Sequence, residues 1–182
     1  LQGGFDEIAL NGGKAANQPH PALLDLAFRQ ALARGIDKAG ATEDLWFGYG
    51  EPATAVSMGA DFKWVPDIAE AEQFAYDPAL ANKLLDEAGY LDTDGDGLRE
   101  MPGGGDNITL RHAINTDTDL GQAVGELFSG WMNAIGIDVQ LDSYDQDQLF
   151  GVIVDGTYDT FYWGWVPFVD PNPMLSYWTE AE

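Results

Sequence analysis

Apolar residues recur along the chain at two different spacings, and each spacing predicts a different kind of element. Recurrence every three or four residues predicts helices over 23–36, 77–89, 119–135 and 145–154. Alternation of apolar and polar residues predicts strands over 5–10, 108–114, 137–142 and 158–165. Helices and strands therefore alternate from residue 77 onward, which predicts an α/β fold whose mixed sheet is covered by helices.

Helix-capping and helix-breaking residues indicate where several of these helices begin and end. Asp77 followed by Pro78 is typical of a helix start, and Gly89 is typical of a left-handed C-terminal cap. Gly35 and Gly40 are expected to close the first helical region. The stretch 41–75 has no clean period and is expected to be an irregular excursion with short helical turns, which in a compact domain often accompanies a site.

The charge balance excludes several classes of partner. The 182 residues include 31 acidic side chains and 8 Lys and Arg, which gives a net charge of -23. Such a chain repels nucleic-acid phosphates and anionic lipid head groups, so no nucleic-acid partner is expected. Solubility, or a saline habitat, accounts for the same excess without a binding function. The absence of cysteine removes disulfides, thiolate metal sites and Cys nucleophiles.

One acidic loop has the opening pattern of a calcium-binding loop. Carboxylates at alternate positions, followed by a glycine that permits a sharp turn, direct oxygen atoms toward a hard cation. The expected ligands are the carboxylates and one main-chain carbonyl of Asp92, Asp94, Asp96, Leu98 and Glu100. Gly103 stands where a bidentate Glu normally closes the shell, and Asp106 is the substitute for it. The alternative is an Asp-Gly turn without an ion.

An aromatic segment near the end of the chain is the candidate ligand-binding element. Alternation places Phe161, Trp163 and Trp165 on one strand face and Tyr162 on the other, while Gly164 permits close approach. Aromatic rings, main-chain amides and a nearby carboxylate such as Asp170 suit a peptide. The alternative is an aromatic core strand.

Catalytic patterns are weak, so the chain is expected not to be an enzyme. His20 and His112 lack the spacing of a metal pair and are interpreted as structural. No serine lies in a nucleophile elbow, and no phosphate-binding loop is present in the sequence. Carboxylate pairs arise by chance among so many acidic residues, which leaves a glycoside hydrolase fragment as one alternative and a calcium-stabilised secreted module as another.

Several segments, in order and together, resemble the family 5 extracellular solute-binding proteins. The Arg29–Leu32 run within the first helix and the Tyr76-Asp77-Pro78 start that leads to Glu87-Ala-Gly89-Tyr90 carry much of the likeness. The other matching segments are 8–11, 17–37, 48–53, 92–100, 135–139 and 158–171. The resemblance covers nearly the whole chain.

This resemblance implies a periplasmic-binding-protein-like type II lobe, with residues 1–182 forming one lobe of a larger two-lobe protein. It implies non-catalytic binding of an oligopeptide or other small solute outside the cytoplasm, in a periplasmic protein or a surface lipoprotein. The partners would be ABC transporter permease subunits and the first lobe of the same parent chain. No cofactor is required, and calcium would be structural.

The resemblance also implies which residues meet the solute. The stretch after Gly164 lines the site in the family, with Trp165 and Val166 at lining positions, and Trp163 and Asp170 complete the candidate set. In peptide-binding members an Asp usually stands three residues after that Trp. This chain has Phe168 there, which leaves the identity of the solute open.

Overall fold

The structure is a computed structural model that describes residues 4–13, 19–54, 67–69 and 73–165. Its strands are β1 (Phe5–Leu10), β2 (Thr109–Asn115), β3 (Asp138–Tyr144) and β4 (Thr160–Trp165). Its helices are the 3-10 turn η1 (Pro21–Leu24), α1 (Leu26–Gly35), α2 (Lys38–Trp46), α3 (Pro78–Glu87), α4 (Asp119–Asn133) and α5 (Gln146–Asp155). The strand predicted over 5–10 has the predicted bounds. The other three predicted strands are also confirmed, with one or both ends shifted by one or two residues.

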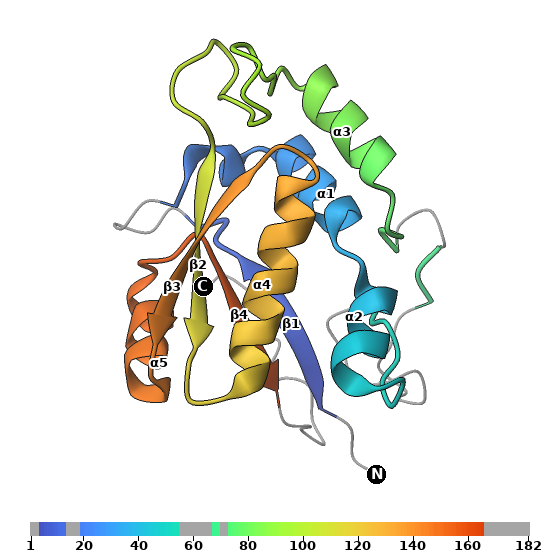
Figure 1. Cartoon of the computed structure of the whole chain (residues 1–182), viewed down its shortest axis with the longest axis vertical. Coiled ribbons are helices and arrows are strands. Elements are labelled where there is room, and N and C mark those ends of the chain that lie inside the picture. Colours follow the sequence, from blue (N-terminus) through green and yellow to red (C-terminus); the bar gives the residue numbers. More distant parts are fainter. Residues whose placement is uncertain (1–3, 14–18, 55–66, 70–72, 166–182) are drawn as a thin grey trace.

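The described strands form one mixed sheet in the order β1-β4-β2-β3. Strand β2 runs parallel to both β3 and β4, and β1 runs antiparallel to β4. The first and last strands of the described chain are therefore neighbours at one side of the sheet (Figure 1). The predicted α/β class with a mixed sheet is confirmed.

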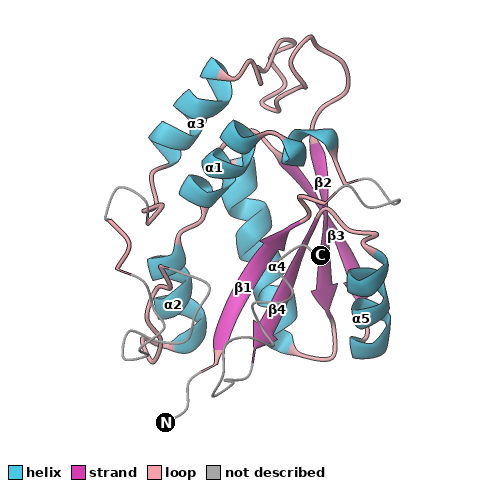
Figure 2. Ribbon diagram, turned by 180° about the vertical axis from the view of Figure 1, so that it is seen from behind, coloured by secondary structure: helices cyan, strands magenta, loops and turns pink. Residues whose placement is uncertain are grey.

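Helices cover the two faces of the sheet unequally. Helix α4 packs on one face together with α1, whereas α5 packs on the opposite face beside β2 and β3 (Figures 1 and 2). The larger core lies under α1, α3 and α4, where Phe28 and Tyr90 meet with ring centroids 5.0 Å apart. A smaller core of Ala113, Leu149 and Phe161 lies under α5. Burial of these apolar surfaces is the main source of the fold's stability.

The predicted helix boundaries at α3 and α5 are confirmed by their caps. The Asp77 carboxylate accepts a hydrogen bond from Leu80 N–H at 2.9 Å, which satisfies one of the unpaired donors of the first turn. Asp145 forms a capping box with Gln148 at the start of α5. Gly89 has a φ of 87°, as expected for a left-handed cap.

The expectation for 35–46 was wrong in one respect. Gly35 does end α1, but Gly40 lies inside a second helix, α2, which the sequence reading placed partly in an irregular stretch. Asp37 caps this helix by accepting from Gly40 N–H at 2.9 Å. Helix α2 buries none of its residues, so it has no apolar stripe from which it could have been recognised. In the described residues, no helix has the length and apolar character needed to cross a membrane.

Candidate functional site

The candidate ligand-binding segment begins in β4. Trp163, Gly164 and Trp165 form the last three residues of this strand, whereas Val166 and Asp170 lie outside the described residues. The first half of β4 is core, since Phe161 and Tyr162 are buried. Trp163 and Trp165 are only partly buried. The core-strand interpretation therefore applies to the first half of β4, and ligand binding by the second half stays a prediction.

The register of β1 and β4 determines which side chains share a face with the two tryptophans. Phe5 lies opposite Trp165, and Glu7 lies opposite Trp163 in the antiparallel pair. Cross-strand neighbours point to the same side of a sheet, so these four side chains form one patch. The patch is on the α5 side, because Trp163 packs against the small core under α5. We call it the Glu7 face.

Gly164 lies close to a β1 side chain on the opposite side of the sheet. Its partner in the register is Asp6, and a Cβ atom built on Gly164 would lie 2.8 Å from Asp6 Oδ1. That same oxygen accepts a hydrogen bond from the Tyr162 hydroxyl at 2.7 Å. Burial, followed by the bond and charge of Asp6, raises the pKa of Tyr162. The space beside Gly164 thus holds a side chain of β1.

Glu7 and Phe5 are the two residues of the Glu7 face that the sequence analysis missed, and Glu7 is the charged one. Its Oε1 accepts a hydrogen bond from the Trp165 indole Nε1 at 2.7 Å, and the Trp165 ring stacks on Phe5 with centroids 6.2 Å apart. Burial raises the pKa of Glu7 to about 7, although the bond from Trp165 acts in the opposite direction. The two partners are 158 residues apart in the chain, so only the sheet register brings them together.

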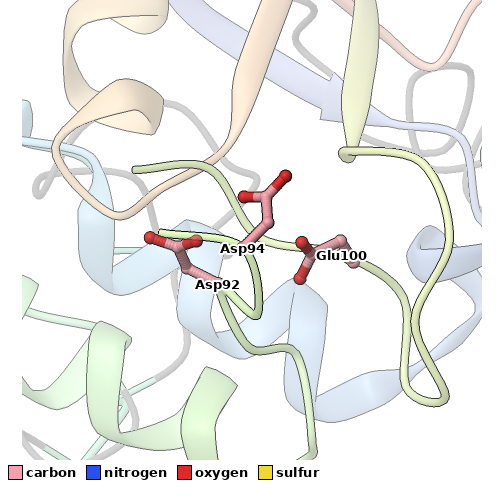
Figure 3. Close-up of side chains that lie close together, drawn as sticks. All are labelled: Asp92, Asp94 and Glu100. Atoms are coloured by element: carbon pink, nitrogen blue, oxygen red, sulfur yellow. The ribbon is translucent and has the colours of Figure 1, made fainter. Parts of the chain in front are cut away.

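The acidic loop brings together some of its predicted ligands. One carboxylate oxygen from each of Asp92, Asp94 and Glu100 lies within 4.8 Å of the others (Figure 3). Asp92 also accepts hydrogen bonds from Gly95 N–H and Gly97 N–H, and the buried Glu100 accepts from Thr93 N–H. Oxygen donors of this kind fit a hard divalent cation.

Asp96 and Leu98 lie outside this group of three carboxylates. The carboxylate of Asp96 accepts hydrogen bonds from Leu98 N–H at 2.8 Å and from Asn107 Nδ2 at 2.7 Å. These bonds hold the pKa of Asp96 below its ordinary value. Metal binding by any of the five predicted ligands stays a prediction.

Arg99 connects the acidic loop to the neighbouring helices through several hydrogen bonds. Its guanidinium donates to Asp86 Oδ1 at 2.6 Å, to the Tyr90 carbonyl and to Asn82 Oδ1, and its Nε donates to the Ile135 carbonyl at 2.8 Å. These partners belong to α3 and to the turns that follow α3 and α4. Because one side chain donates to all of these acceptors, Arg99 links the loop to α3 and to the turn that follows α4.

The two histidines have structural positions. His112 is fully buried in β2, where its Nδ1 lies 2.7 Å from Thr160 Oγ1 and its ring packs on Phe128. His20 caps η1, because its Nδ1 accepts from Ala22 N–H at 3.3 Å. The two rings are on different elements and share no hydrogen-bond partner among the contacts described here.

Solved structures of solute receptors share this arrangement of sheet and helices. The oligopeptide-binding protein AppA from Bacillus subtilis, solved in complex with a nonapeptide, superposes with a TM-score of 0.79 at 22% identity. The match covers 92% of this chain and 32% of AppA. The described residues therefore share the α/β fold found in part of these periplasmic binding proteins.

Sequence comparison defines the family. The sequence model of the bacterial extracellular solute-binding proteins, family 5 middle region, matches residues 2–182, and the chain belongs to this family. The nickel-binding periplasmic protein of Escherichia coli K12 is 28% identical over 176 residues, which are 93% of this chain and 30% of that protein. A putative ABC transporter peptide-binding protein of Brucella ovis is 40% identical over 74 residues, or 41% of this chain and 13% of that protein.

The chain spans about a third or less of the length of these relatives. These relatives differ in the solutes they are associated with, since one is named for nickel, one for peptides, and one was solved with a nonapeptide. Family membership thus establishes solute-binding proteins as the class, and the choice of solute depends on residues of each member.

Proposed function

We propose that this chain is one lobe of an extracytoplasmic receptor that captures an oligopeptide for an ABC importer. The observation that carries the proposal is the family match over residues 2–182, together with the partly buried tryptophans at the end of β4. The matching family and the relatives are named as binding proteins, which favours a binding role over a catalytic one. The first lobe of the parent protein and the importer's permease subunits are the proposed partners.

The solute would be held between two lobes that close on it, with Trp163 and Trp165 facing the closed space. Aromatic rings bind side chains of varied shape through apolar contact and stacking, which suits a receptor for peptides. Hinge closure then completes the contacts that one lobe cannot make alone. The periplasm or the outer cell surface is the proposed location, in keeping with relatives that are named as periplasmic.

Calorimetry of the full-length parent protein tests this function. Peptide pools, a nickel chelate and a neutral oligosaccharide would be titrated in turn, and the proposal predicts heat and saturation with peptides. Trp165→Ala should weaken peptide binding by tenfold or more, since it removes both ring contacts and the partner of Glu7. Phe150→Ala is the control, because Phe150 is an exposed aromatic on α5. Binding of the oligosaccharide alone would contradict an oligopeptide receptor.

A structural calcium ion at the acidic loop is a second, separate proposal. The convergence of Asp92, Asp94 and Glu100 favours it, because three carboxylates that approach so closely repel one another unless a cation or protons intervene. The ion would join the loop between α3 and β2 and would take no part in solute chemistry. The proposal predicts that a chelator lowers the melting temperature of the protein.

A further inference from the structure

The Glu7 face is left open by the helices of the described chain. Helix α5 covers β2 and β3 on this side of the sheet. Figure 2 shows no described helix in front of the other two strands, β1 and β4. Glu7, Trp163 and Trp165 are partly buried, so each presents some surface. A carboxylate between aromatic rings on an open sheet surface differs from the salt-bridged carboxylates elsewhere in the chain.

Glu7 has no cationic protein partner within the described residues. The ion pairs there join Lys83 to Glu87, Arg99 to Asp86 and Arg111 to Asp159. The one hydrogen bond described for the Glu7 side chain comes from the Trp165 indole. A carboxylate has about four acceptor positions, so this single donor leaves most of them available.

Nearby titratable groups do not neutralise Glu7 either. Tyr158 lies close enough to interact with the Glu7 charge. Its pKa is raised first by burial and then by that negative charge. Asp6 is the neighbour in sequence, but its carboxylate is bound to Tyr162 on the opposite side of the sheet. The Glu7 face therefore carries one acidic group that has no cationic partner among the described residues.

Cations are the ligands that such a patch attracts. A partly buried carboxylate gains when a positive group replaces the lost water, and the π-faces of tryptophan attract cations. Ammonium and guanidinium groups can donate to the open oxygens of Glu7 while their carbon stems lie along the rings. The net charge of -23 raises the local concentration of cationic solutes still further.

We infer that Glu7 recognises a cationic group, an ammonium or a guanidinium, on the peptide solute, and that the adjacent tryptophan rings hold the stem of that group. This inference rests on the proposed function and adds to it a preference within the peptide class. The rival explanation is structural: Glu7 would serve only as the acceptor for the Trp165 indole. A glutamine at position 7 separates the two explanations, because its amide oxygen still accepts from the indole but carries no charge.

The experiment uses the full-length parent protein with Glu7→Gln and Asp6→Asn variants. Asp6→Asn is the matched control, since it removes the neighbouring charge on the other side of the sheet. The probes are the tripeptide Ala-Lys-Ala, its N-terminally acetylated form and its side-chain-acetylated form, each titrated by calorimetry at pH 8. The melting temperature of each variant is measured beforehand to establish that it is folded.

The inference predicts that the wild type and Asp6→Asn bind at least one cationic form tenfold or more tightly than the form that lacks the same cation. Glu7→Gln should reduce this ratio to about one. Between pH 8 and pH 6 the wild-type preference should fall as Glu7 takes up a proton, whereas Glu7→Gln shows no such fall.

Two results would overturn the inference in different ways. Peptide binding with an unchanged preference in Glu7→Gln leaves the proposed function intact and reduces Glu7 to a partner of Trp165. Failure of the wild-type parent to bind any of the three peptides, while it binds a different solute, contradicts the oligopeptide function itself and removes the inference with it.

Discussion

The Asp159 carboxylate and the Arg111 guanidinium form a two-point ion pair between β2 and the residue that precedes β4. Arg111 Nη2 lies 2.9 Å from Asp159 Oδ1, and Arg111 Nε lies 3.0 Å from Oδ2. The same carboxylate accepts from the main-chain N–H groups of His20 and Arg111. One acidic residue thus ties the loop before η1 to the two central strands, and it holds β4 in the position from which Trp163 and Trp165 emerge.

Asp159→Asn should destabilise the fold by about 2 kcal/mol at pH 7. Breaking a buried pair costs more than breaking an exposed one, but the partly exposed Arg111 is screened by solvent, which lowers the cost. Chemical denaturation measures the change. Asp86→Asn, which breaks the more exposed pair with Arg99, should cost less and serves as the comparison. Equal losses in the two variants would contradict this account.

Stability should also fall in acid through Asp159. Burial raises its pKa, but the hydrogen bonds from Arg111 and from the main chain outweigh burial and hold the pKa below its ordinary value. A carboxylate with a depressed folded-state pKa contributes stability that is present above the unfolded-state value of 3.8 and is lost as the pH falls further. Asp159→Asn should remove this part of the acid transition.

His112 should make the fold sensitive to a milder acid range. Burial lowers its pKa from 6.5 to about 3. Below pH 6.5, therefore, His112 becomes protonated in the unfolded chain but stays neutral in the folded chain. The contribution of His112 to the free energy of unfolding is therefore fully present above pH 6.5. It should decline toward pH 3 by on the order of 1 kcal/mol per pH unit. Denaturant midpoints of the wild type and His112→Gln between pH 7 and pH 4.5 measure this slope. A slope that is equally steep in both would exclude His112 as its cause.

Glu7 should affect stability with the opposite sign. Its folded-state pKa is raised to about 7, so its contribution to stability is fully present below 4.5 and is lost as the pH rises through 7. Glu7→Gln removes the buried charge and keeps an acceptor for Trp165, and it should stabilise the fold at pH 8 by about 1 kcal/mol after allowance for solvent screening. Thermal unfolding at pH 5 and pH 8 checks this, with a stabilisation expected only at the higher pH.

Gly164→Ala should destabilise the sheet where Gly151→Ala does not. The new Cβ at 164 would lie 2.8 Å from Asp6 Oδ1 and displaces the Asp6 carboxylate from the Tyr162 hydroxyl, and losing that hydrogen bond should cost about 1 kcal/mol. At Gly151, inside α5, a Cβ has no atom within 4 Å, and alanine favours the helix by roughly 0.5–1 kcal/mol. Opposite shifts of the melting temperature are therefore expected.

Chelation should lower the melting temperature if the acidic loop holds calcium. A ligand at one hundred times its dissociation constant stabilises the folded state by about 2.7 kcal/mol, and that contribution disappears with a chelator. Asp94→Asn should abolish the response to calcium, whereas Asp119→Asn, at the start of α4, should retain it. An identical melting temperature with calcium and with chelator would reduce the loop to a turn held by Arg99.

Local sequence signals predicted most of the fold, because its elements carry their own boundaries. Alternation located the strands, and Asp77, Gly89 and Asp145 located helix ends through hydrogen bonds within a few residues. Helix α2 was misread because it buries no side chain and contains Gly40, so neither period nor composition marks it as a helix. Its start depends on the cap by Asp37, which is visible only in the structure.

The candidate site was less predictable because its contacts join the two ends of the chain. The aromatic segment of β4 was apparent in the sequence, but the partners of its residues are in β1. Glu7 looked like an ordinary polar position of an alternating strand, and only the register with Trp163 and Trp165 makes it part of the patch. The loop carboxylates were predicted as a set, yet Asp96 turns toward Asn107 because of contacts outside the motif.

The most direct test of the central claim is a side-by-side titration of the full-length parent protein and this 182-residue chain with the same peptide pool. The account predicts saturable binding by the parent and an affinity at least a hundredfold weaker for the chain, because one lobe offers only part of the contacts. Equal affinity of the two would contradict capture between closing lobes. Failure of the parent to bind any peptide would contradict the proposed function.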